Sequence, residues 1–282
     1  MNRILKLWQP AMLAVVALAF NACTEEYDYV PVSDTDFSGA YILADETTLI
    51  LGEDDAQQLS FTVARHDSTE AATYKLYTTN SNINIPEEVS FAANEGTKHF
   101  TIDFDIPVGT IEEEVTIGVE EGQEYMYGAH SQTYTISRCR RIPGQTIMAS
   151  YFFGDGQGGP GTWLLDIYEY GTLTDEETGA KTARYLLKEP YLVAAQVGQG
   201  YGDGYNVIFS LDSEGNASTA EQGLYYDTYN GGEVVVAGSG TYYPQYNAII
   251  FAWSMNIPSL GGGFGAIEHD IYFPAGYNPL PQ

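Results

Sequence analysis

Short runs of alternating hydrophobic and polar residues fill the chain over residues 37–141. In the run QLSFTVARH, Leu59, Phe61 and Val63 occupy every second position and therefore lie on one face of an extended strand. The run VSFAANEGTKHFTIDFDI continues the alternation on both sides of an Asn-Glu-Gly turn, and EEVTIGVEE and QTYTISR extend it. No window of this part has a helical stripe. Short strands separated by regular turns are typical of a two-sheet fold, so we predict a Greek-key β-sandwich here.

Strand patterns recur over residues 142–282. They occur in TIMASYFF, TWLLDIYEY, ARYLLK, YLVAAQV, GYNVIFSL, EVVVAG, NAIIFAW and AIEHDIYF, and the run FSLDSEGNAST predicts a hairpin around Gly215. A meander of this many strands closes into a barrel or folds into a sandwich, because its edges would otherwise stay open. We therefore predict an all-β chain whose second domain is an antiparallel β-barrel or β-sandwich.

A basic cluster precedes the predicted boundary between the two domains. Arg138, Arg140 and Arg141 are followed by Ile142 and a Pro-Gly pair, which is typical of a connection between domains. These arginines either pin the domains together by pairing with carboxylates or are solvated at a strand end.

The first 22 residues have the layout of a secretory signal. Arg3 and Lys6 precede an apolar stretch from Ala11 to Phe20, and a small residue stands before Cys23. That stretch is far shorter than the roughly 20 apolar residues that cross a bilayer, so we predict a cleaved leader and no permanent transmembrane helix.

Cys23 is a poor candidate for a catalytic thiol, because it lies at the edge of the predicted leader. Ala22-Cys23 after a charged and apolar leader resembles a bacterial lipoprotein signal, which implies that Cys23 is lipidated and becomes the first mature residue. The acidic segment TEEYDYVPVSDTD completes a tether over residues 23–36. It is similar to the tethers of Bacteroides-type lipoproteins that face the cell exterior from the outer membrane. An ordinary cleaved signal remains the alternative.

Both predicted domains also resemble known modules. FTVAR, INIPEEVSFAANEGTKHFTIDF and YTISR resemble the Calx-β-like and immunoglobulin-like modules of such lipoproteins. RYLLKEPY, GTYYP and GGGFG look like the C-terminal β domain of lipoproteins found beside starch-utilisation-type glycan uptake systems. The second resemblance implies a glycan ligand and an outer-membrane transporter complex as a partner. Some Calx-β modules bind calcium, for which Glu53, Asp54 and Asp55 are the acidic turn to consider; simple solvation of that turn is the alternative.

The charge of the chain excludes some partners. The 282 residues contain 11 Lys and Arg against 38 Asp and Glu, a formal net charge of -27. Such a surface repels nucleic acid and anionic lipid head groups, so we expect the acyl anchor alone to hold the chain at the membrane.

The sequence has no catalytic motif. It lacks the G-x-S-x-G nucleophile turn, and the four histidines are too scattered to form a metal-binding motif. A pair of carboxylates for glycoside hydrolysis stays open, because their separation is a three-dimensional property. We name no catalytic residue and no cofactor, with calcium as the open exception.

Aromatic residues next to glycine-rich loops indicate where a ligand binds. More than half of the 23 tyrosines and of the 30 glycines follow residue 141, and rings flank the loops GDGQGGPG and GQGYGDG. Flat rings stack on the C–H faces of sugars while Asp and Asn bond their hydroxyls. Burial of these rings in a core is the alternative. The predicted ligand-binding residues are Trp163, Tyr201, Asp203, Tyr205, Tyr229 and Trp253.

Three functions follow, in order of preference. The first is a non-catalytic, surface-anchored lipoprotein that binds extracellular glycan or another nutrient for an outer-membrane uptake system. The second is a structural or protein-interaction subunit of a surface complex, and the third is a glycan-acting hydrolase. Exposed rings favour the first, and an apolar patch or unpaired strand edge favours the second.

Overall fold

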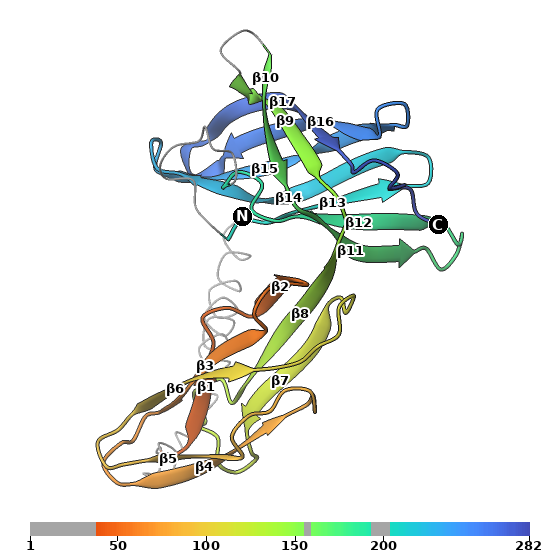
Figure 1. Ribbon diagram of the computed structural model, residues 1–282. Helices are drawn as coiled ribbons and strands as arrows, with labels where there is room; N and C mark the ends of the chain where they lie inside the picture. The colour runs from red at the N-terminus through yellow and green to blue at the C-terminus, as the bar shows by residue number, and fades with distance from the viewer. Residues whose placement is uncertain (1–37, 155–158, 193–203) are drawn as a thin grey trace, which may run out of the picture.

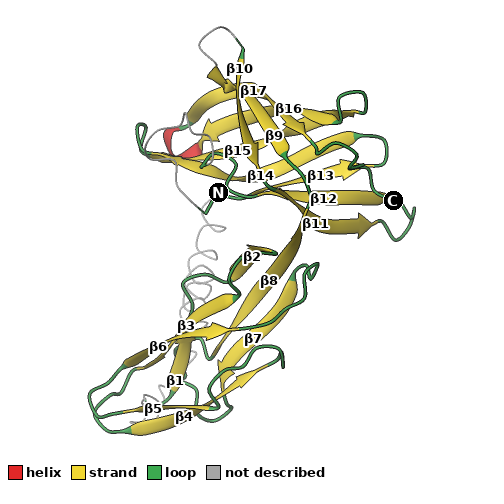
Figure 2. Ribbon diagram, viewed as in Figure 1, coloured by secondary structure: helices red, strands yellow, loops and turns green. Residues whose placement is uncertain are grey.

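The computed structural model describes residues 38–154, 159–192 and 204–282. Strands make up almost all of its regular structure, with one short 3-10 helix, η2 (Pro258–Leu260), and no α-helix in these ranges, which confirms the all-β prediction (Figures 1 and 2). The strands are β1 (Ala40–Leu43), β2 (Thr48–Gly52), β3 (Gln58–Arg65), β4 (Ala72–Thr78), β5 (Glu88–Phe91), β6 (Thr97–Asp103), β7 (Glu113–Val119), β8 (Ser131–Arg141), β9 (Thr146–Gly154), β10 (Pro160–Leu165), β11 (Ile167–Thr174), β12 (Lys181–Leu187), β13 (Val207–Asp212), β14 (Asn216–Asp227), β15 (Gly232–Tyr243), β16 (Ala248–Ile257) and β17 (Gly262–Tyr272).

The N-terminal strands form two layers around one core. Strands β1-β3-β6 make a three-stranded sheet, and β5-β4-β7-β8 lie in the second layer with β2 added parallel to β8. Leu59, Phe61 and Val63 all point inward from β3 and are buried, as their alternation predicts. The turn at Asn94 does not close a hairpin, because β5 pairs with β4 whereas β6 pairs with β3 in the other sheet. Asn94 has φ 67°, a left-handed conformation that Asn tolerates, and there the chain passes between the layers.

The C-terminal strands form one long antiparallel meander. Its order is β10-β9-β17-β16-β15-β14-β13-β12-β11, so within the described ranges β10 ends the sheet and does not pair with another strand to close a barrel. The hairpin predicted around Gly215 is present, with Ser210 opposite Ser218. The run TWLLDIYEY does not form one strand: it divides at Asp166 into β10 and β11, which pair with different neighbours.

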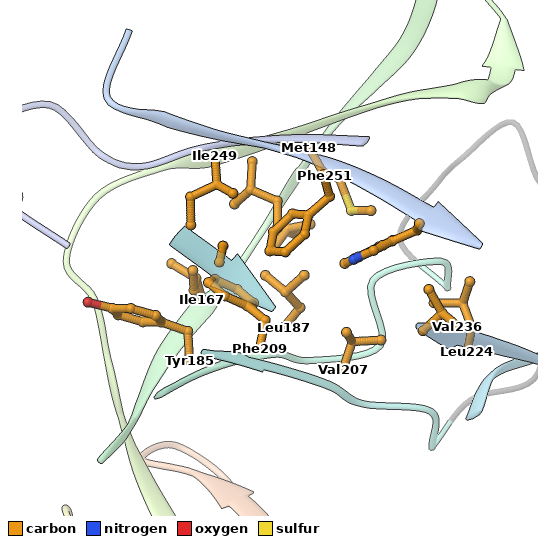
Figure 3. Close-up of a cluster of buried hydrophobic side chains, with 14 of the residues drawn as sticks. Met148, Ile167, Tyr185, Leu187, Val207, Phe209, Leu224, Val236, Ile249 and Phe251 are labelled. Carbon is orange, nitrogen blue, oxygen red and sulfur yellow. The ribbon is translucent and has the colours of Figure 1, made fainter. Parts of the chain in front are cut away.

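The curled meander encloses its own hydrophobic core. Side chains from β9, β12, β13 and β16 meet inside it, among them Met148, Leu187, Val207, Phe209 and Phe251 (Figure 3). Two of these side chains are aromatic: the rings of Phe209 and Phe251 pack edge to face, with 5.4 Å between their centroids.

Strand β8 joins the two parts of the molecule. Its first residues pair with β7 and β2, and its last two, Arg140 and Arg141, pair with β11, so one sheet path runs through both (Figure 1). A small apolar cluster around Cys139 and Tyr168 fills the junction. Gly52 approaches so closely that a Cβ on it would stand 2.7 Å from the ring of Tyr168.

Charged side chains reinforce this junction. Arg141 pairs with Asp166 at 2.6 Å, and Arg184 pairs with Glu112 at 2.8 Å. The guanidinium of Arg138 donates to the backbone carbonyls of Ile106 and Glu53 and also lies 3.9 Å from the carboxylate of Asp105. Carboxylate and backbone carbonyl groups therefore bind Arg138 and Arg141, two of the three arginines of the basic cluster that precedes the Pro-Gly pair.

Candidate functional site

A cleft of about 610 Å³ opens between the two parts of the molecule. Ligand sites of small molecules usually measure a few hundred to a thousand Å³ and often lie between domains. The residues that line the cleft are Glu46, Thr48, Leu49, Ile50, Leu51, Asp55, Gln58, Lys188, Glu189, Gly204, Tyr205, Asn206, Gly223 and Glu233.

Strand β2 forms the N-terminal side of the cleft. Among the described strands it pairs with β8 alone, and its residues 48–51 line the cleft. Asp55, in the turn that follows, accepts a hydrogen bond from the N–H of Gly52 at 2.8 Å and pairs with Lys188 at 2.5 Å. This ion pair ties the two sides together.

A strained turn positions the C-terminal side. Glu189 has φ 44°, which is uncommon for a residue with a side chain, and hydrogen bonds hold it there. Its N–H donates to Asn206 Oδ1 at 3.2 Å, and its Oε1 accepts the N–H of Gly204 at 2.7 Å. These bonds fix Asn206 and its neighbour Tyr205 at the cleft.

The ring of Tyr205 lies in a space that a glycine leaves open. A Cβ on Gly223 would stand 2.9 Å from this ring and 2.6 Å from Glu233 Oε1, so only glycine leaves both groups in place. Burial, with the nearby Glu233 carboxylate as a second cause, raises the pKa of Tyr205. The phenol is thus a neutral hydrogen-bonding group beside a carboxylate.

The opening beside Tyr205 arises where β13 and β14 separate. They pair only at Ser210 and Leu211, and nearer the cleft the side chain of Gln222 replaces the missing backbone partner. Its Oε1 accepts the N–H of Ile208 at 2.8 Å and its Nε2 donates to the carbonyl of Ile208 at 2.7 Å. The backbone N–H and carbonyl of Ile208 therefore stay hydrogen-bonded although β13 and β14 separate beside the cleft.

Trp163 contacts the segment that forms the C-terminal side of the cleft. It is half-buried, and its indole N–H donates to the carbonyl of Pro190 at 2.8 Å, one residue after Glu189. Its ring packs edge to face on Tyr191, whose hydroxyl is hydrogen-bonded to the buried His269. Trp163 therefore positions the turn at Glu189 and does not line the cleft.

Two further predicted rings lie away from the cleft. Trp253 is 0% exposed, and its indole N–H donates to Thr219 at 3.1 Å inside the core, so the prediction that it presents a stacking face to ligand is wrong. The alternating pattern of its strand does not reveal which of the two faces is covered by other strands. Tyr229 is 95% exposed in the turn between β14 and β15 and does not line the cleft. Cys23, Tyr201 and Asp203 lie outside the described residues.

The sequence reasoning missed Lys188, Glu189, Gly223 and Glu233 as site residues. One signal for the first two is present, because Lys-Glu-Pro interrupts the pattern of RYLLKEPY and predicts the end of a strand. Gly223 and Glu233 have no such signal, since each sits within an alternating strand whose partner the sequence does not specify.

The cleft is acidic. Glu46, Asp55, Glu189 and Glu233 line it against Lys188, which is already paired. In the described ranges, no group of three or more His, Cys, Asp or Glu side chains is arranged to hold a metal ion. In the acidic turn, Glu53 accepts a hydrogen bond from the backbone N–H of Arg141 at 3.4 Å, and Asp55 accepts one from Lys188.

A second hollow, of about 460 Å³, lies beside the C-terminal residues. The phenol of Tyr277 donates there to Glu169 at 3.0 Å, and Tyr185 donates to the carbonyl of Pro279. Because these polar groups bond to each other and to the C-terminal segment, the interdomain cleft is the stronger candidate.

Comparisons with known proteins add little to this geometry. No protein-family model matches the chain, and no curated protein matches it. A solved Bacteroides ovatus structure, described as structural genomics of unknown function, is similar at 10% identity and TM-score 0.30, covering 83% of this chain and 92% of that chain. A second one from the same organism, described in the same way, has 9% identity and TM-score 0.27, covering 86% and 97%. Within the described ranges, no helix is long and apolar enough to cross a membrane.

Proposed function

We propose that this chain is a surface-anchored, non-catalytic lipoprotein that binds extracellular glycan in the cleft between its two domains. It would act for an uptake system of the outer membrane, with Cys23 as its lipid anchor. The anchoring part rests on the leader and the lipoprotein-like Ala22-Cys23 junction.

The observation that carries glycan binding is the group around Tyr205. The cleft offers a ring next to Asn206 and Glu233, and sugars are recognised by rings that stack on C–H faces together with amides and carboxylates that bond hydroxyls. Hydrogen bonds through Glu189 and close packing at Gly223 hold this group before ligand arrives. Preorganisation of this kind reduces the entropic cost of binding.

The cleft also indicates which glycans to test first. Its carboxylates outnumber its one lysine, which is paired with Asp55, so an anionic polysaccharide would meet repulsion. Neutral glycans are the expected ligands.

Affinity electrophoresis of residues 24–282 against plant, host and microbial polysaccharides tests the proposal. We expect retardation by a neutral glycan, and Tyr205→Ala should weaken binding by about two- to thirteenfold, which corresponds to the loss of about 0.5–1.5 kcal/mol of stacking. Tyr229→Ala is the matched control, because that tyrosine is exposed but lies outside the cleft. The glycan should keep its length on incubation; shortened products would instead support the hydrolase.

A protein-binding role is the second candidate, and one surface favours it. Leu164 lies on β10, the last described strand of the sheet, opposite Ile147 on β9, and the two side chains are 49% and 40% exposed. Apolar side chains beside an open strand edge are typical of an interface. If no glycan binds, while Leu164→Glu abolishes co-purification of one membrane protein with the anchored chain, this role replaces the first.

A further inference from the structure

A cluster of aromatic side chains lies where β1 begins and β7 leads into β8, at the opposite end of β8 from its junction with β11. Tyr125 is at its centre, with ring centroids of Tyr41, His66 and Tyr127 at 5.6, 5.5 and 5.7 Å. Met126 and Tyr127 are 63% and 59% exposed. We call these five residues the aromatic platform. The sequence reasoning assigned no role to them.

The platform is a fixed feature of the fold. The N–H of Tyr125 donates to the carbonyl of Ala40 at 2.8 Å, and the N–H of Ala40 donates to the carbonyl of Gln123 at 2.9 Å. A Cβ on Gly128 would stand 2.7 Å from the side chain of Tyr41, so glycine is needed for this close approach. The loop that carries Tyr125 is therefore bonded directly to the first described strand.

The topology places the platform at a defined end of the molecule. The loop precedes β8, which runs from Ser131 beside the platform to Arg141 at the junction with the C-terminal domain (Figure 1). Described structure begins at Ser38, two residues before Ala40, so residues 1–37 join the domain at the same end. The platform and Ser38, where the described structure begins, thus lie at the end of the N-terminal domain opposite the C-terminal domain.

We infer that the aromatic platform rests on the lipid surface to which the chain is anchored and holds the cleft away from the membrane. This inference depends on the anchoring part of the proposed function. Cys23 precedes Ser38 by 15 residues, which span at most about 54 Å when extended, so the anchor keeps this end of the domain within that distance of the bilayer.

The chemistry of the platform fits the membrane interface. Tyrosine is enriched where head groups meet the hydrocarbon, because its ring is apolar and its hydroxyl is polar, and methionine adds a flexible apolar contact. Glu120 and Glu121 lie exposed in the same loop, so the matching surface is zwitterionic. A tether converts contact into an intramolecular step, so a few weak contacts are enough to orient the protein.

Tryptophan quenching by brominated lipid tests the orientation. The mature chain from Cys23 is coupled through that thiol to a maleimide lipid in zwitterionic phosphatidylcholine vesicles. The second thiol, Cys139, is 0% exposed and burial raises its pKa to about 12, so it does not compete. The two tryptophans of the mature chain, Trp163 and Trp253, both lie in the C-terminal domain and serve as internal references.

Tyr127→Trp places a reporter on the platform, and Tyr229→Trp places a matched reporter on an exposed turn of the C-terminal domain. We expect brominated lipid to reduce the emission of the first reporter and to leave the second and the parent chain unchanged. Adding Met126→Asp should abolish the reduction. Equal quenching of both reporters, or of neither, overturns the inference.

Failure of the inference is distinguishable from failure of the proposed function. Mass spectrometry of the membrane-extracted protein reports whether Cys23 carries acyl chains, and glycan retardation reports on the cleft in solution. If Cys23 is acylated and glycan binds while the platform reporter stays unquenched, only the membrane-facing orientation is wrong. If Cys23 carries no lipid, the anchoring proposal fails, and the orientation inferred from it fails as well.

Discussion

Asp55 Oδ2 and Lys188 Nζ lie 2.5 Å apart and connect the turn after β2 to the segment after β12, at the edge of the candidate cleft. Each side chain is 29% exposed, so solvent screens the pair only in part. The contact joins residues 133 positions apart in the chain. It therefore links the geometry of the cleft to the arrangement of the two domains.

A double-mutant cycle measures the worth of this pair. Asp55→Asn and Lys188→Met should each lower the free energy of unfolding, with a coupling energy of about 0.5–1 kcal/mol that shrinks in high salt. Denaturant unfolding at low and high ionic strength provides the measurement. Additive effects of the two substitutions would show that the pair contributes no coupling.

Gly52→Ala should destabilise the packed junction between the two parts of the molecule. The added methyl group would stand 2.7 Å from the buried ring of Tyr168, and overpacking of this kind costs about 1–3 kcal/mol. We expect a lower midpoint of thermal unfolding. Gly262→Ala is the control, because a Cβ there meets nothing within 4 Å and its φ is ordinary. Equal midpoints for the two variants would contradict the close packing of Gly52.

The two tryptophans of the C-terminal domain should respond differently to truncation. Trp253→Ala empties a fully buried site and should cost about 3–5 kcal/mol of stability. Trp163→Ala should cost less, because its ring is half-buried, but it should weaken glycan binding by releasing the carbonyl of Pro190 beside Glu189. Thermal unfolding and glycan retardation, measured on both variants, test the distinction. Glycan binding unchanged in Trp163→Ala would contradict its positioning role.

Acid should destabilise the C-terminal domain through His269. Burial lowers the pKa of this imidazole from 6.5 to about 4. Below pH 6.5, His269 therefore binds a proton in the unfolded chain but stays neutral in the folded chain. Stability contributed by the neutral ring is present above pH 6.5 and is lost as the pH falls toward 4, by about 3 kcal/mol.

Urea unfolding at pH 7, 5.5 and 4.5 measures this loss. Carboxylates with lowered pKa, such as that of Asp227, also lose stability in acid, so the comparison must be between variants. His269→Gln should flatten the slope relative to the parent chain, and His99→Gln, at an exposed position, should leave it unchanged. Parallel slopes for the parent chain and His269→Gln would rule out His269 as the cause.

Local pattern determined much of the secondary structure. Alternation identified the inward face of β3, and the turn chemistry around Gly215 identified the β13–β14 hairpin, because side-chain period and turn preference depend on neighbours along the chain. The same pattern predicts a single strand from Thr162 to Tyr170, whereas the structure divides this run at Asp166, because its two halves pair with different strands.

The sequence by itself determined an all-β chain with a strongly acidic composition, since these follow from residue counts and short-range order, and it predicts a lipoprotein-like leader. Only the tertiary structure decided that Trp253 is core, that Tyr205 faces a cleft, and that Lys188 meets Asp55. Alternation gives each strand two faces but does not say which neighbour covers which face. Strand order settles that, through contacts between residues far apart in the chain.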